Sequence, residues 1–295
     1  MNAREAGFLL LSGKLGDSDR KPLTTAQLRQ LAQRAALLPP PDEAAQLDVS
    51  HLMSIGMDRK LSEHILALLE DELQLNAYLA KAEKYGCRPI TRASGEYPLI
   101  LRKRFGFDAP GCLWAKGNPE ILKMPAVSLV GSRELNGPNR KFAREVGIQA
   151  AKQGFALVSG NARGADFTAQ SACLQAGGCV ISVVADALTE HPLENNVLYV
   201  SEEGFDEPFS TFRALHRNYV IHAWGEVAFV AQCSMEKGGT WDGSAQNLRK
   251  KWSPLYCFRD ESAASAALEG MGAVLIDTEQ LQDFHSFTDS QLGFF

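Results

Sequence analysis

Two short apolar segments of the chain each end in a glycine-containing turn that carries an arginine. The first turn contributes Gly131, Ser132 and Arg133. The second turn contributes Ser159, Gly160, Arg163 and Gly164. In an open parallel sheet, turns of this kind meet at the carboxyl edge of the strands, where helix N-termini direct free N–H groups toward an anion. The residue types and their spacing therefore predict a site for phosphate.

A third turn follows the apolar stretch at 227–231 and combines a lysine, glycines and a threonine. Its candidate binding residues are Lys237, Gly239 and Thr240. Glycines followed by a threonine at a helix start supply N–H and hydroxyl donors to phosphate. We expect Asp242 to cap a helix that begins near Gly243. Trp241 has two interpretations, which are stacking on a nucleobase and packing beneath the loop.

The sequence lacks the motifs that usually indicate an active site or a metal site. It contains no G-x-S-x-G elbow and no Walker lysine, and neither glycine-arginine turn contains the G-x-G-x-x-G dinucleotide fingerprint. The six cysteines include no C-x-x-C pair, and the six histidines show no H-E-x-x-H spacing. We therefore expect no catalytic residue, no bound metal, no cofactor and no enzymatic activity.

Composition and charge limit the partners of the chain. Of its 295 residues, 45% are hydrophobic and 22% are charged, which is ordinary for a globular protein. Because the sequence shows neither a signal-peptide pattern nor an apolar run of about 18 residues, we expect a cytoplasmic protein with no membrane partner. The formal net charge is −5, but residues 86–200 carry 13 basic and 9 acidic side chains. A polyanion is therefore expected to bind at a local patch in this region.

Residues 1–85 have the apolar spacing of helices and predict a small helical domain of the SAM or helix-hairpin-helix type. Within it, residues 54–65 resemble two short helices joined at a glycine. Such a hairpin can present backbone N–H groups to DNA phosphate. The alternative is a plain helical bundle with a glycine at a helix end.

Residues 86–277 predict a second domain in which strands alternate with helices. After strands near 89–91 and 112–118, further strands are expected near 126–130, 155–159, 179–184, 198–200, 226–231, 254–258 and 273–276. Helices are expected at about 138–153, 164–176, 209–223, 243–251 and 262–271. This alternation predicts an α/β fold, an extended Rossmann-like, doubly wound and mostly parallel sheet that carries the phosphate site. Residues 278–295 are expected to form a short C-terminal tail.

The chain resembles the DNA-processing protein A family, also called DprA or Smf, over roughly residues 50–260. The segments that carry the resemblance, in order, are 54–65, 89–91 with 96–98, 113–118, Val130-Gly131-Ser132-Arg133, Ser159-Gly160 with Ala162-Arg163-Gly164 and Asp166, 201–202, Phe212 to Arg217-Asn218, and Gly239-Thr240. The resemblance implies an extended Rossmann fold. It also implies a pocket in which Arg133, Arg163 and either Lys237 or Arg217 receive the phosphates of single-stranded DNA.

The same resemblance implies a biological role. Members of this family protect incoming single-stranded DNA and assist the loading of a RecA-type recombinase during natural transformation. They commonly form homodimers and act without a nucleotide cofactor or catalytic turnover. By this resemblance the chain is a DNA-binding protein of DNA recombination and competence.

Two other hypotheses remain open. The sheet and the loop Gly238-Gly239-Thr240 are also similar to those of the lysine-decarboxylase-like phosphoribohydrolases, which bind or hydrolyse small nucleotides. This chain has Asp242-Gly243 where those enzymes carry a glutamate after the loop. In the third hypothesis the pocket is vestigial, and the acidic last third of the chain docks a basic partner.

Overall fold

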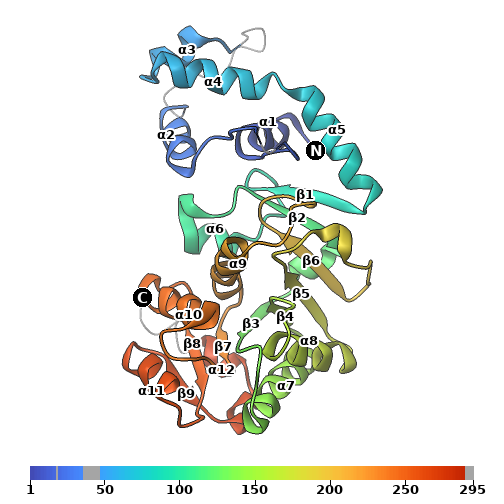
Figure 1. Ribbon diagram of the computed structural model, residues 1–295, viewed down its shortest axis with the longest axis vertical. Coiled ribbons are helices and arrows are strands. Elements are labelled where there is room, and N and C mark those ends of the chain that lie inside the picture. Colours follow the sequence, from blue (N-terminus) through green and yellow to red (C-terminus); the bar gives the residue numbers. More distant parts are fainter. Residues whose placement is uncertain (18, 36–46, 290–295) are drawn as a thin grey trace.

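The computed structural model describes residues 1–17, 19–35 and 47–289. The helices before the first strand are α1 (Ala3–Ser12), α2 (Thr25–Ala35), α3 (Val49–Ser54), α4 (Arg59–Leu69) and α5 (Glu72–Lys84) (Figure 1). Leu52 and Ile65 belong to a small apolar cluster among these helices. Leu9 of α1 and Tyr78 of α5 belong instead to the core that covers one face of the sheet. The helical segment is thus attached to the sheet through α1 and α5.

The α3–α4 hairpin uses its own N–H groups internally. The Gly56 N–H donates to the Met53 carbonyl at 2.8 Å. At the start of α4, the Leu61 N–H donates to the carboxylate of the capping residue Asp58 at 2.9 Å. A carboxylate at this helix N-terminus occupies the position that a phosphate would take and repels it. These contacts favour the plain helical bundle over a DNA-binding hairpin at residues 54–65.

Nine strands of the described residues form one sheet. They are β1 (Cys87–Thr91), β2 (Cys112–Gly117), β3 (Ala126–Val130), β4 (Ala156–Ser159), β5 (Cys179–Val183), β6 (Val197–Ser201), β7 (Ala228–Val230), β8 (Leu255–Phe258) and β9 (Val274–Ile276). Their order across the sheet is β1-β2-β6-β5-β4-β3-β7-β8-β9. Strands β3 to β9 pair in parallel. Strands β1 and β2 are antiparallel and extend the sheet beyond β6.

Helices cover both faces of this sheet. The helices after β1 are α6 (Leu99–Phe105), α7 (Gly137–Lys152), α8 (Ala165–Gln175), α9 (Thr211–Trp224), α10 (Gly238–Lys250), α11 (Ala263–Gly270) and α12 (His285–Asp289) (Figure 1). Short 3-10 helices lie at η1 (Gly106–Asp108), η2 (Pro119–Lys123), η3 (Leu188–Glu190) and η4 (Thr278–Gln282).

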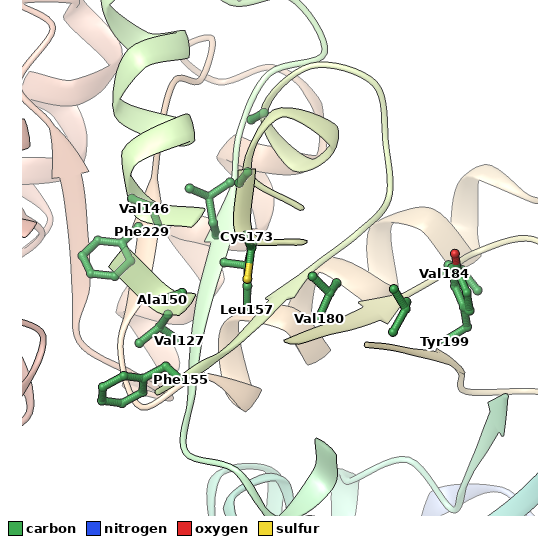
Figure 2. Packing of buried hydrophobic residues seen from close by; sticks show 14 of the residues in the cluster. Val127, Val146, Ala150, Phe155, Leu157, Cys173, Val180, Val184, Tyr199 and Phe229 are labelled. Atoms are coloured by element: carbon green, nitrogen blue, oxygen red, sulfur yellow. The ribbon is translucent and has the colours of Figure 1, made fainter. Parts of the chain in front are cut away.

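Alternate side chains of each strand enter two different cores, as the two-residue period of a strand requires. Val127 and Leu157 pack with Val146 of α7 and Cys173 of α8 on one face (Figure 2). Their neighbours Ala126, Val130, Ala156 and Val158 enter the other core, with side chains of α9 and α11. Burial on both faces explains why these strands read as continuous apolar runs in the sequence.

The structure confirms the predicted fold class, a doubly wound and mostly parallel sheet preceded by helices. One predicted helix start is wrong, because α10 begins at Gly238 and has Lys237 as its N-cap. Asp242 therefore lies inside the helix and does not cap it. Its carboxylate instead accepts a hydrogen bond from the Tyr219 hydroxyl. Helix α6 has no counterpart among the predicted elements.

The segment after β9 packs against the sheet. Leu281, Phe284 and Phe287 are buried in the same core as α7 and α8. Among the described residues, no helix is long and apolar enough to cross a membrane. The same residues contain no group of histidine, cysteine, aspartate or glutamate side chains arranged to hold a metal ion.

Candidate functional site

The order of the strands locates the site. Strands β4, β5 and β6 follow one another on one side of β3. The chain then crosses back, and β7, β8 and β9 follow one another on the other side of β3. The order in which strands are added therefore reverses between β3 and β7, and α9 is the helix of the connection from β6 to β7 (Figure 1). Ligands of doubly wound sheets bind at such a switch point, outside the carboxyl ends of the strands.

Two adjoining cavities open at this point, with volumes of about 530 and 420 Å³. The larger is lined by Val130, Gly131, Ser132, Arg133, Ala162, Asp166, Phe209, Thr211, Ala214, Leu215, Arg217, Asn218, Ser234, Lys237, Gly238, Gly239 and Thr240. The smaller is lined by Arg133, Gly160, Asn161, Ala162, Arg163, Ala185, Asp186, Phe209 and Arg217. Because four residues line both cavities, the two are parts of one cleft, which we call the switch-point cleft.

The turns after β3 and β4 lie directly against each other beside this cleft. Gly164 has a φ of +89°, and a Cβ at this position would overlap the carbonyl oxygens of Ser132 and Arg133. The Ala165 N–H donates to the Ser132 carbonyl at 3.1 Å. Glycine is required here both by the positive φ and by the close approach of the neighbouring turn. This contact fixes the two predicted arginine turns relative to each other.

The structure brings most of the predicted phosphate-binding residues together. All twelve except Ser159 and Gly164 line the switch-point cleft. Arg133, Arg163 and Lys237 are exposed at its surface. Arg163 lies 3.4 Å from Glu134, but both side chains are more than three-quarters exposed, so this pair is weak. Among the described residues, no carboxylate lies within ion-pair distance of Arg133 or Lys237. The side chains of Arg133 and Lys237 are therefore free to bind an anion.

Arg217 differs from the other three cations because it is buried in the wall of the cleft. It is 7% exposed, and its guanidinium lies 3.6 Å from the equally buried carboxylate of Asp166. The guanidinium occupies the space that a Cβ at Gly160 would take, so a larger residue there would displace it. Burial raises the pKa of Asp166 and lowers the pKa of Arg217, and the charge of each partner opposes these shifts. Within the described residues, Nε and Nη1 of Arg217 have no hydrogen-bond partner.

Two helix N-termini at the cleft have no side-chain cap. Helix α8 begins after Gly164 and α10 begins after Lys237, and neither N-cap side chain accepts a hydrogen bond from the first turn. By contrast, Asn136 caps α7 and Ser210 caps α9. The first N–H groups of a helix carry a partial positive charge when no acceptor satisfies them. At α8 the Ala165 and Phe167 N–H groups already donate to the Ser132 and Ala162 carbonyls. At α10 these groups belong to Gly238, Gly239 and Thr240, which all line the cleft.

The carboxylates of the cleft are already engaged. Asp166 faces Arg217, and Asp186 lies 3.0 Å from the His191 ring nitrogen Nε2. That hydrogen bond lowers the pKa of Asp186. Asp242, the acidic residue after the glycine-threonine loop, does not line the cleft and is held by Tyr219. The described cleft therefore offers no unengaged carboxylate as a general base.

Two features of the cleft were not predicted from the sequence. Phe209, from the loop between β6 and α9, lines both cavities and is 57% exposed. No pattern around this residue indicates binding, since only the tertiary fold carries the loop to the glycine turns. The second feature that the sequence did not predict is the pairing of Asp166 with Arg217.

Trp241 is half-buried and packs against the core on the α9 face of the sheet, which matches its packing interpretation.

A doubly wound sheet with an open cleft at its switch point defines a Rossmann-like protein, here with exposed cations lining the cleft. The family model described as DNA recombination-mediator protein A matches residues 88–282. The chain belongs to this family, and the predicted family resemblance is confirmed.

The similar proteins include DNA processing protein DprA from Streptococcus pneumoniae, which is 34% identical over 152 residues. That alignment covers 48% of this chain and 53% of the relative, so the chain spans about half the length of that curated protein. The crystal structure of DprA from S. pneumoniae has a TM-score of 0.72 and 23% identity, covering 95% of this chain and 96% of the other. A structure of DNA processing protein A from Helicobacter pylori, described for its single-stranded DNA binding mode, has a TM-score of 0.55 and 21% identity, covering 70% and 96%.

Proposed function

We propose that the switch-point cleft binds single-stranded DNA through its phosphates. The observation that carries this proposal is the convergence of exposed Arg133, Arg163 and Lys237 on one cleft beside the uncapped N-terminus of α10. Side-chain cations and helix N-termini are the usual partners of phosphate in proteins. The chain as a whole carries a net charge of −5, so the attraction is local.

The family supports a wider role for the same binding site. As a DNA processing protein, the chain would bind single-stranded DNA during transformation and recombination, and hold it for a RecA-type recombinase. In this role the protein acts as a homodimer in the cytoplasm and does not turn over a substrate. The binding residues are those of the three glycine turns, with Arg217 and Asn218 of α9 in the wall of the cleft.

The nucleotide-hydrolase hypothesis is not favoured. The family match assigns the chain to the DNA recombination-mediator proteins. In addition, each carboxylate that lines the cleft already has a charged or hydrogen-bonded partner. We therefore expect no release of free base when the protein is incubated with nucleoside monophosphates.

Arg133→Ala and Arg163→Ala are each expected to weaken binding of a single-stranded oligonucleotide by about tenfold, because each removes a charge-assisted hydrogen bond to phosphate. Each variant should also reduce the slope of log K against log salt by about 0.7, the value for one lost phosphate contact on a single strand. Fluorescence anisotropy titrations at several salt concentrations measure both quantities.

Arg249→Ala provides the matched control for this prediction. Arg249 is an exposed arginine near the C-terminal end of α10, and it does not line the cleft. Its removal is expected to leave both affinity and slope nearly unchanged. Equal titrations for the two cleft variants and the unmodified protein would contradict the proposed function, as would a flat salt response of the unmodified protein.

A further inference from the structure

The connection between β6 and α9 is held in place by side chains from outside it. Residues 202–210, which we call the wall segment, are irregular, so no helix or strand of their own fixes their shape. Phe205 is fully buried, and its ring centroid lies 4.7 Å from that of Tyr78 in α5 and 5.3 Å from that of Trp114 in β2. The Leu188 N–H donates to the Phe205 carbonyl at 2.7 Å. The wall segment is thus packed between the sheet and the N-terminal helices.

Asp206, the next residue of the wall segment, binds two side chains of α5. The Tyr78 hydroxyl donates to one of its carboxylate oxygens at 2.6 Å, and the Lys81 ammonium donates to the other at 2.6 Å. The Asp206 side chain is 17% exposed, so water screens these contacts less than it screens those of an open surface pair. Hydrogen bonds with an ionised partner are also stronger than neutral ones. Helix α5 therefore fixes the wall segment through a specific polar contact as well as through packing.

The wall segment connects this contact to the switch-point cleft over a short distance. Phe209, three residues after Asp206, lines both cavities of the cleft. Three residues of chain span at most about 11 Å, and the ring of Pro208 fixes one backbone torsion between them. Arg213 of α9 is buried and donates to the carbonyls of Glu207 and Pro208 at 2.8 and 2.7 Å. A shift of Asp206 is therefore transmitted to the wall of the cleft.

We propose that Tyr78 and Lys81 of the N-terminal helices are positioning residues for the switch-point cleft, and that they act through Asp206. This inference rests on the proposed binding of single-stranded DNA, and it gives the helical segment a role in binding that needs no contact with DNA. With both contacts in place, the wall segment holds the cleft in the shape that receives the strand. Without them the wall segment takes other positions as well, and the apparent affinity falls by the fraction of molecules that remain correctly shaped.

The test compares Lys81→Met with the matched control Arg29→Met, using fluorescence anisotropy with an oligothymidylate on the full-length protein. Arg29 is also a cation of the N-terminal helices, but it pairs with Asp108 of η1, outside the wall segment, at 2.8 Å. We expect Lys81→Met to weaken binding by about fivefold, the lower end of the usual range for coupled sites. Tyr78→Phe removes one hydroxyl, keeps the buried ring and should have a similar effect. Arg29→Met should leave the affinity nearly unchanged.

Further binding measurements separate positioning from a direct contact with DNA. Lys81 does not line the cleft, so the slope of log K against log salt should be the same in Lys81→Met as in the unmodified protein. Lys81→Arg keeps a cation beside Asp206 and should retain the affinity of the unmodified protein. In an Asp206→Ala background, Lys81→Met should cause no further loss, because the two residues act as a pair.

Hydrogen exchange tests the wall segment itself, without DNA. Amides of residues 203–209 should exchange faster in Lys81→Met and Tyr78→Phe than in Arg29→Met, because only the first two variants release Asp206. Exchange in the rest of the sheet should be equal in all three variants, which also shows that each of them is folded.

The outcomes distinguish the inference from the proposed function. If the unmodified protein binds the oligonucleotide and both Lys81→Met and Tyr78→Phe bind it equally well, the positioning role is wrong while DNA binding stands. A lower salt slope in Lys81→Met would make Lys81 a direct phosphate contact and would overturn the inference. An equal loss in Arg29→Met, or unchanged exchange of the wall segment, would overturn it too. If the unmodified protein binds no single-stranded DNA, the proposed function fails, and the inference fails with it.

Discussion

Asp166→Ala is expected to lower the free energy of unfolding by about 3–5 kcal/mol, because it leaves the charge of Arg217 buried without its partner. Both side chains are less than a tenth exposed, and they lie 3.6 Å apart. Nε and Nη1 of Arg217 have no hydrogen-bond partner among the described residues, and the carboxylates of Asp186 and Glu202 favour its charge less than Asp166 does. The Asp166 carboxylate also accepts a hydrogen bond from the Ala162 N–H at 3.3 Å, which is lost at the same time.

Urea unfolding followed by circular dichroism measures this effect. Asp108→Ala is the control, because Asp108 pairs with Arg29 on the surface, where the side chains are 66% and 44% exposed. Its loss should cost less than about 1 kcal/mol. The double variant Asp166→Ala with Arg217→Leu should recover much of the lost stability, since it removes the unpaired charge as well. A loss in Asp166→Ala no larger than that in the control would show that the pair is not buried in solution.

The strands and helices around the sheet could be predicted because the physics that forms them is local. Strands buried on both faces read as short apolar runs, and the helices between them repeat apolar residues at helical spacing. The stretches at 126–130 and 155–159 are of the first kind and became β3 and β4. The glycine turns after them could be assigned to one edge of the sheet, because parallel strands all end at the same edge.

The start of α10 could not be predicted in the same way. Gly238 and Gly239 have low helix propensity and read as a loop, so the predicted helix began near Gly243. In the structure both glycines form the first turn of α10, and Gly239 approaches a side chain of α9 closely. A Cβ at Gly239 would lie 2.6 Å from the side-chain nitrogen of Asn218. The tertiary contact outweighs the local propensity at this position.

The burial of Arg217 and the exposure of Phe209 were also beyond the sequence. An arginine that follows a helical pattern looks like a surface cation, and a phenylalanine near a proline looks like core. The structure gives the opposite exposure for both, with Arg217 at 7% and Phe209 at 57%. Burial of an arginine depends on a carboxylate more than fifty positions earlier in the chain, here Asp166. Exposure of Phe209 depends on how the loop before α9 crosses the glycine turns, which no local pattern records.

His222 should make the stability of the protein depend on pH between about 6.5 and 3. This side chain of α9 is fully buried, and neither ring nitrogen has a hydrogen-bond partner among the described residues. Burial lowers its pKa from 6.5 to about 3. The unfolded chain therefore takes up a proton near pH 6.5, while the folded protein stays neutral at this position. The contribution of His222 to the free energy of unfolding is therefore fully present above about pH 6.5. It falls by about 1.4 kcal/mol per pH unit as the pH drops toward 3.

His222→Leu removes the titrating group and should flatten this part of the profile. Between pH 7 and pH 4.5, the unmodified protein is expected to lose about 2.5 kcal/mol more unfolding free energy than the variant does. Urea unfolding at the two pH values measures the difference, and other titrating groups cancel in the comparison. His64→Gln is the control, because His64 lies near the surface of the N-terminal helices, with its ring nitrogen Nε2 2.9 Å from the Lys21 carbonyl. Parallel profiles for His222→Leu and the unmodified protein would mean that water or a partner reaches the ring, since an imidazole that is solvated in the folded state keeps its ordinary pKa.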